Sequence, residues 1–157
     1  MYRHILLTSL LLAVAGCTPD DVTGPGDVRW DREVCARCSM AVGDRSFAAQ
    51  VRGAPAGERT RLYKFDDIGC AVIWLQDQAW KDDPRTELWV VDHNNGEWLD
   101  ATGASYIKGG LSPMNYGLAA QAEAVADALD FEQAVAHIMR VENEHHLHGG
   151  RNPQESE

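Results

Sequence analysis

The part of the chain that decides the fold reads LYKFDDIGCAVIWLQDQA over residues 62–79. Its first four residues predict a β-strand, and Asp67 follows where the N-cap of a helix belongs. The apolar residues after Asp67 have the spacing of one helical face. They are Ile68, Ala71, Val72, Leu75 and Ala79. This stretch therefore predicts a strand that leads into an amphipathic helix.

Further strands are predicted on both sides of this unit. The segments that we interpret as strands are 46–52, 88–91, 98–99 and 104–108. A Gly/Pro-rich turn at 53–57 makes the first of them a hairpin partner of residues 62–65. Asn94-Asn95-Gly96 supplies the positive-φ residues of a tight turn into Trp98.

A loop is predicted at residues 109–117, and a second helix is predicted to begin at Asp130. Residues 130–135 repeat the cap, the apolar entry and the Ala-Val step of residues 67–72. The repetition is consistent with two related strand-strand-helix units. Two unrelated amphipathic helices would share it equally well.

The N-terminus has the features of a bacterial lipoprotein export signal. Arg3 and His4 precede an apolar run that ends in Gly16-Cys17. A run this short and this early is typical of a cleaved signal rather than of a spanning helix. We therefore expect a signal peptide over residues 1–16, a lipid on Cys17 and a flexible tether over 17–29. In a Gram-negative cell, Thr18 favours anchorage in the outer membrane, facing the periplasm.

The rest of the chain is expected to form one domain, residues 30–141, followed by a disordered tail, residues 142–157. The tail is polar and contains His145, His146 and His148. The formal net charge of −10 at pH 7 argues against nucleic acid as a partner. The chain has no Gly-x-Ser-x-Gly motif and no phosphate-binding glycine loop, so a hydrolase or nucleotide site is not indicated.

Residues 35–40, Cys-Ala-Arg-Cys-Ser-Met, place two thiols and a thioether in one short loop. Soft sulfur donors select soft metals, and this combination suits Cu(I). Zinc usually takes four N or S ligands, and the chain has neither a second Cys-x-x-Cys nor a His-x-x-x-His. The competing interpretation is a disulfide between Cys35 and Cys38, structural or redox-active, because an exported protein meets an oxidising compartment.

Other residues can approach such a site, but most have a simpler interpretation. Cys70 is interpreted as a small buried hydrophobe, and Asp66 and Asp67 as turn and cap residues. His93 is expected in an exposed loop. Met114 lies in a Pro/Gly-rich loop with no apolar pattern around it, which makes it a candidate ligand.

Several motifs follow one another along residues 17–139. They are Cys17, Cys35-x-x-Cys38-x-Met40, Tyr63-x-Phe65-Asp66-Asp67-Ile68-Gly69-Cys70, Trp89-Val90-x-Asp92, Gly96-x-Trp98-Leu99-Asp100-Ala101 and Ser112-Pro113-Met114-x-Tyr116-Gly117-Leu118-Ala119. In this order they resemble the NosL family of nitrous oxide reductase accessory lipoproteins. The resemblance implies an α+β fold of two small ββαβ-like subdomains, similar to a part of organomercurial lyase.

The resemblance also implies a function. Members of the NosL family are Cu(I) metallochaperones, not enzymes, and supply copper for maturation of nitrous oxide reductase. They work with a periplasmic partner and an ABC-type transporter complex in the membrane. The motifs carry over Cys38 and Met40 as the first Cu(I) ligand candidates, Met114 as the next and Cys35 beside them. Ser39 stands where a glycine is common in the family.

We therefore expect a lipid-anchored copper carrier that passes Cu(I) to a partner by ligand exchange. The alternatives are a copper sensor or buffer, a thiol-disulfide oxidoreductase and a carbon-metal lyase that uses Cys35 and Cys38. A lyase requires a third thiol or a carboxylate at this pair. Cys70 or Asp67 meets that condition only if the start of the predicted helix faces the loop.

Overall fold

The computed structural model describes residues 22–149, and the strand-helix unit predicted within residues 62–79 is confirmed. β2 (Arg61–Phe65) leads into α1 (Ile68–Gln76). Asp67 is the N-cap of α1, and its side chain accepts a hydrogen bond from the Gly69 N–H (2.9 Å). The helix ends before Ala79, the last residue of the predicted stripe. The turns that follow bring the Trp80 ring against Tyr63 and Trp74.

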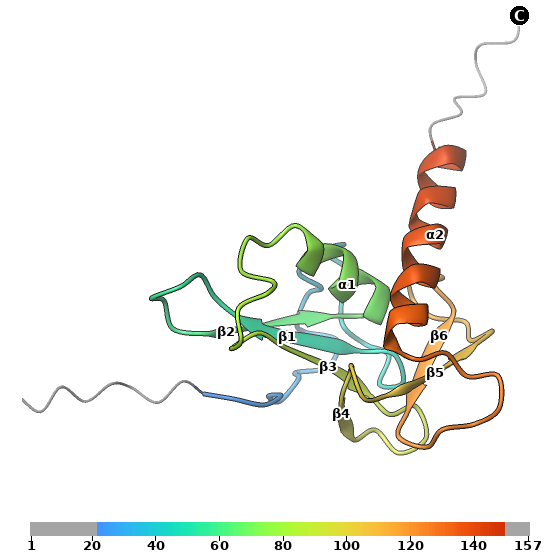
Figure 1. The fold of residues 1–157 in the computed structure, drawn as a ribbon, viewed down its shortest axis with the longest axis horizontal. Helices are drawn as coiled ribbons and strands as arrows, with labels where there is room; N and C mark the ends of the chain where they lie inside the picture. The colour runs from blue at the N-terminus through green and yellow to red at the C-terminus, as the bar shows by residue number, and fades with distance from the viewer. Residues whose placement is uncertain (1–21, 150–157) are drawn as a thin grey trace, which may run out of the picture.

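α1 packs on a four-stranded antiparallel sheet (Figure 1). The strands lie in the order β2-β1-β3-β4, with β1 (Ala49–Gly53), β3 (Glu87–Val91) and β4 (Trp98–Asp100). β1 is buried along its whole length and pairs with β2 and β3. The predicted hairpin joins β3 to β4. Of its turn residues, Gly96 takes the positive φ, 81°.

A second, smaller unit follows in the chain. β5 (Ser105–Lys108) and β6 (Leu118–Gln121) form a two-stranded antiparallel sheet, and α2 (Phe131–Gly149) comes after them. The sequence does not predict β6, because its residues are not β-branched. The strand forms through its pairing with β5 and through a bridge between Ala120 and Asp92.

The predicted α+β class is confirmed, with two antiparallel sheets and two helices among the described residues. The first unit has the connectivity β1-β2-α1-β3, which is ββαβ. The second has β5-β6-α2, and within residues 22–149 no strand follows α2. The two helices contact each other, so both units share one core.

The predicted tether is not free along its whole length. Gln50 on β1 is fully buried, and its amide accepts from the Gly26 N–H (2.8 Å) and donates to the Gly26 carbonyl (2.7 Å). Arg52 donates to the Gly24 carbonyl (2.8 Å). Buried polar side chains need partners, and here the chain before residue 30 supplies them. The folded domain therefore begins earlier than predicted.

The predicted start of the tail is also wrong. α2 begins at Phe131, close to the predicted position, but it continues to Gly149, so residues 142–149 are helical. The reason is a tertiary contact: the Glu142 side chain is mostly buried and accepts hydrogen bonds from Arg37 and Tyr116. This contact fixes the helix beyond its apolar stripe.

The predicted signal peptide, the lipidated Cys17 and residues 150–157 lie outside the described residues. In the part of the chain that is described, no helix is both long and apolar enough to cross a membrane.

The close approach of Tyr116 to α1 gives a stability prediction. A Cβ added at Gly69 would lie 2.1 Å from the buried Tyr116 ring. Gly69→Ala should therefore destabilise the protein by about 1–3 kcal/mol through overpacking, although alanine is the better helix former. Thermal unfolding measures the change.

The matched control is Gly103→Ala, whose Cβ would meet nothing nearer than a carbonyl at 3.8 Å. Equal melting temperatures for the two variants would contradict the packing described here.

Candidate metal centre

The loop that carries Cys35 and Cys38 is closed by its own backbone. The Cys35 N–H donates to the Met40 carbonyl (2.8 Å), and the Ser39 N–H donates to the Cys35 carbonyl (3.0 Å). Ser39 has φ 64°, in the left-handed region that glycine enters most readily. The Ala36 N–H donates to the Lys64 carbonyl (2.9 Å), which fastens the loop to β2.

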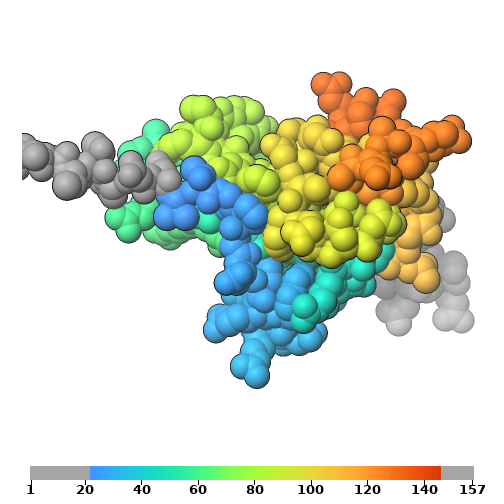
Figure 2. Space-filling model, turned by 90° about the horizontal axis from the view of Figure 1, so that it is seen from below, coloured from blue at the N-terminus to red at the C-terminus, as the bar shows by residue number. Residues whose placement is uncertain are grey.

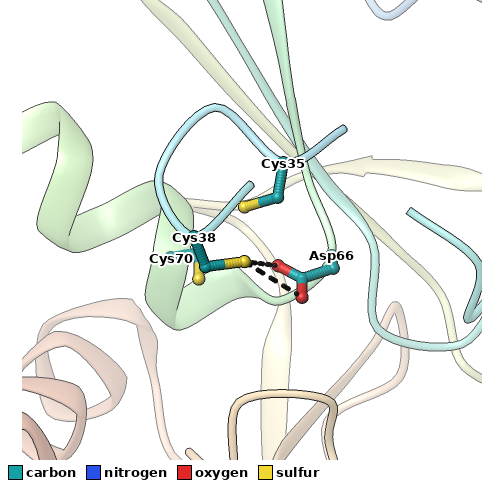
Figure 3. Close-up of side chains that lie close together, drawn as sticks. All are labelled: Cys35, Cys38, Asp66 and Cys70. Atoms are coloured by element: carbon teal, nitrogen blue, oxygen red, sulfur yellow. Dashed lines mark hydrogen bonds between the residues drawn. The ribbon is translucent and has the colours of Figure 1, made fainter. Parts of the chain in front are cut away.

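Four side chains converge at this loop. Cys35 and Cys38 come from the loop, Asp66 follows β2, and Cys70 lies in the first turn of α1 (Figure 3). Their candidate ligand atoms all lie within 4.8 Å of one another. The Cys38 thiol donates to both Asp66 carboxylate oxygens, at 3.5 and 3.4 Å. We call these four residues the cysteine cluster.

The cysteine cluster is mostly enclosed. Cys35, Asp66 and Cys70 are buried, and Cys38 is partly exposed. None of these three cysteines forms a disulfide. The segment before β1, blue in Figure 2, projects from the body of the molecule. The loop of residues 35–40 belongs to this segment, and Cys38 is the partly exposed member of the cluster.

The structure brings Cys35 and Cys38 together and adds two residues to which the sequence assigns other roles. Cys70 is buried, as predicted, but it belongs to the cysteine cluster rather than only to the core. Asp66 is more than a turn residue, because its carboxylate accepts from Cys38. A local signal for both existed: the Asp67 cap sets Asp66 just before the helix and Cys70 in its first turn. The missing information was that the loop packs against this helix start.

The other predicted residues have different surroundings. The Met40 side chain is 45% exposed beside the loop. Met114 is half-buried, and its N–H donates to Asp67 (3.2 Å), which ties its loop to the start of α1. Asp67 itself is the buried cap, and burial raises its pKa. His93 is half-buried and contacts Gln121 (3.3 Å). Ligation by Met40 and Met114 stays a prediction.

The three thiols of the cysteine cluster differ in acidity. A hydrogen bond from Cys70 is the main reason why the pKa of Cys35 falls to about 6. Burial is the main reason why the pKa of Cys38 rises to about 11. The hydrogen bond that Cys70 donates to Cys35, together with burial, strongly raises the pKa of Cys70. At neutral pH, Cys35 is therefore the thiolate and the other two cysteines keep their protons.

The dimensions of the cysteine cluster suit a single metal ion. A sulfur ligand lies about 2.3 Å from its metal, so two ligands of one ion are at most about 4.6 Å apart. The candidate ligand atoms lie within 4.8 Å of one another, so a small movement of the side chains would bring them to ligand distance from one ion. Thiolates favour soft or borderline ions such as Cu(I) and Zn(II). The fold assembles three sulfur donors and one carboxylate without a second cysteine pair, so the choice between Cu(I) and Zn(II) stays a prediction.

The fold and the cluster define a small α+β protein with a thiol-rich site that could hold a metal ion. A scan against models of known protein families finds no match for the chain, and a search of curated protein sequences finds none either.

Proposed function

We propose that this protein is a lipid-anchored Cu(I) metallochaperone of the cell envelope that supplies copper for maturation of nitrous oxide reductase. The observation that supports metal binding most strongly is the convergence of three thiols and a carboxylate within 4.8 Å. The choice of copper, of the reductase and of the periplasmic and transporter partners rests on the resemblance to the NosL family.

Cu(I) is the cargo of the proposed carrier, held by the sulfurs of Cys35, Cys38 and Cys70. The buried Cys35 and Cys70 lie on the inner side of the site, and the partly exposed Cys38 lies where a partner approaches. Met40 is an exposed soft donor next to Cys38. A partner ligand that displaces Cys38 first would remove the ion stepwise, without exposing it to water.

The proposed anchor at Cys17 holds the carrier at the membrane, facing the periplasm. Confinement there raises its effective concentration for membrane-bound transporter components and for the periplasmic partner. Residues 18–29 would link the anchor to the domain, and within them Gly24 and Gly26 are hydrogen-bonded to side chains of β1.

The first test is an anaerobic Cu(I) titration of the reduced protein against a competing chelator. Cys35→Ala and Cys38→Ala should each lower the affinity by more than about 100-fold, because loss of a mere outer partner costs about 10–100-fold. Met40→Ala and Met114→Ala should lower it by no more than about tenfold, because the three thiolates hold the ion and the thioethers are weaker donors beside them.

Met139→Ala is the matched control, because Met139 is similarly exposed, at 39%, and lies on α2. Removal of residues 150–157 should also leave the affinity unchanged. Preferential Zn(II) binding, or Cu(I) binding that survives loss of both loop cysteines, would overturn the proposal. Failure to bind Cu(I) together with reversible oxidation of Cys35 and Cys38 would favour a redox protein.

The change in Cu(I) affinity per pH unit reports how many thiols lose a proton when the ion binds. Between about pH 7 and 10, Cys35 is already a thiolate, whereas Cys38 and Cys70 must each release a proton. The Cu(I) affinity should therefore rise about a hundredfold per pH unit in this range, and more steeply below about pH 5, where Cys35 is protonated too. Competition titrations at several pH values measure the slope.

Cys70→Ser should reduce this slope to about tenfold per pH unit, because only Cys38 then releases a proton. An affinity independent of pH would contradict thiolate ligation and favour the methionines alone.

A second candidate, carbon-metal bond cleavage, is favoured by one observation: a third thiol and a carboxylate do converge on Cys35 and Cys38. In such a reaction the thiolates would keep the metal, and a proton would pass to the departing carbon. Incubation with phenylmercuric acetate and excess thiol distinguishes the two functions. We expect stoichiometric binding without release of benzene. Catalytic release that is lost in Asp66→Asn would favour the lyase.

A further inference from the structure

Arg37 lies between the two cysteines of the loop, yet its side chain contacts three other parts of the protein. Its guanidinium donates to Cys70 Sγ on α1 (3.9 Å) and to the Tyr116 hydroxyl (3.0 Å). It also forms an ion pair with Glu142 on α2. The Arg37 side chain is 23% exposed and that of Glu142 is 11% exposed, so the ion pair is largely enclosed.

The guanidinium is locked in place by its partners. The Tyr116 hydroxyl donates to Glu142, so the three side chains bond one another in a closed triangle. The Tyr116 ring in turn packs closely over Gly69, one residue before Cys70. Removing one partner of an enclosed ion pair leaves an uncompensated charge, so these groups act as a unit.

This placement puts a fixed cation next to one sulfur of the cysteine cluster. Within the cluster Cys70 donates a hydrogen bond to Cys35. Its sulfur also accepts a hydrogen bond from Arg37, which lies outside the cluster. A site that holds one Cu(I) among three thiolates and a carboxylate has excess negative charge, which the guanidinium offsets at Cys70. Because Arg37 is part of the loop, the same contact also fixes Cys35 and Cys38 relative to α1.

We propose that Arg37, clamped by Tyr116 and Glu142, is the positioning residue that makes Cys70 a third sulfur ligand and links the metal site to α2. The inference rests on the metal binding proposed above. It assigns a role to Glu142, which the sequence places at the start of a disordered tail.

The test measures Cu(I) affinity by chelator competition and the number of sulfur ligands by X-ray absorption, in the full-length protein. Arg37→Met should lower the affinity about 10–100-fold and the sulfur number from three to two. Cys70→Ser removes a proposed ligand and should lower the affinity by more than about 100-fold. The double variant should lose little more than Cys70→Ser alone, because Arg37 acts through Cys70. Arg37→Lys should recover part of the affinity, since lysine keeps the charge but not the planar fork.

Two further variants keep the test decisive if Arg37→Met does not fold. Tyr116→Phe removes the hydroxyl that contacts Arg37. Glu142→Gln removes the negative charge that pairs with Arg37 while keeping the shape of the side chain. Both should lower the affinity and the sulfur number in the same direction, with the fold checked by circular dichroism. The control is Arg140→Met, which breaks an exposed ion pair with Glu144 on the same helix and should change neither quantity.

The outcomes separate the two proposals. Wild-type protein that binds no Cu(I) would overturn the proposed function, and this inference with it. Wild-type binding with three sulfurs that is unchanged in Arg37→Met, or losses that add up in the double variant, would overturn the role of Arg37 alone. Reduced thermal stability with an unchanged sulfur number would assign Arg37 a purely structural role.

Discussion

The structure depends on the cap that Asp67 places on α1. Its carboxylate accepts hydrogen bonds from the Gly69 N–H and the Met114 N–H. One buried side chain thereby joins the end of β2, the first turn of α1 and the 109–117 loop. Because the cap fixes where the helix begins, it also fixes the two neighbours that matter for the site: Asp66 just before the helix and Cys70 within its first turn.

Burial limits how much negative charge the cysteine cluster can carry. Three thiols and a carboxylate at such short range cannot all ionise, because burial and mutual repulsion both disfavour further negative charge. The protein meets this constraint by leaving the proton on Cys38 and Cys70 and lowering the pKa of Cys35. A bound cation would change the balance, since it would attract thiolates that otherwise repel one another. The metal binding proposed here would therefore be coupled to the release of protons.

The arrangement around the cysteine cluster is asymmetric, which is compatible with the proposed carrier. The buried sulfurs of Cys35 and Cys70 face the protein, as does Arg37 with its partners Tyr116 and Glu142. Cys38 and Met40 are accessible. The accessible donors belong to a loop of the segment before β1, which projects from the body of the molecule in Figure 2. The clamped side reaches α2, so the second unit of the fold contributes to a site that the first unit builds.

The sequence by itself determined the local elements: the Asp67 cap, the helix after it, the hairpin at Gly96 and the start of α2 near Asp130. Caps, turns and apolar periodicity act over a few residues, so they can be predicted from neighbours alone. It also pointed to the Cys35–Cys38 loop as a candidate metal site, and the structure adds Asp66 and Cys70 to it. Only the tertiary structure decided the rest of the site, because Cys38 and Asp66 are 28 positions apart and Arg37 and Glu142 are 105 apart. Contacts at such separations follow from how the two helices and the loop pack, and no local pattern encodes them.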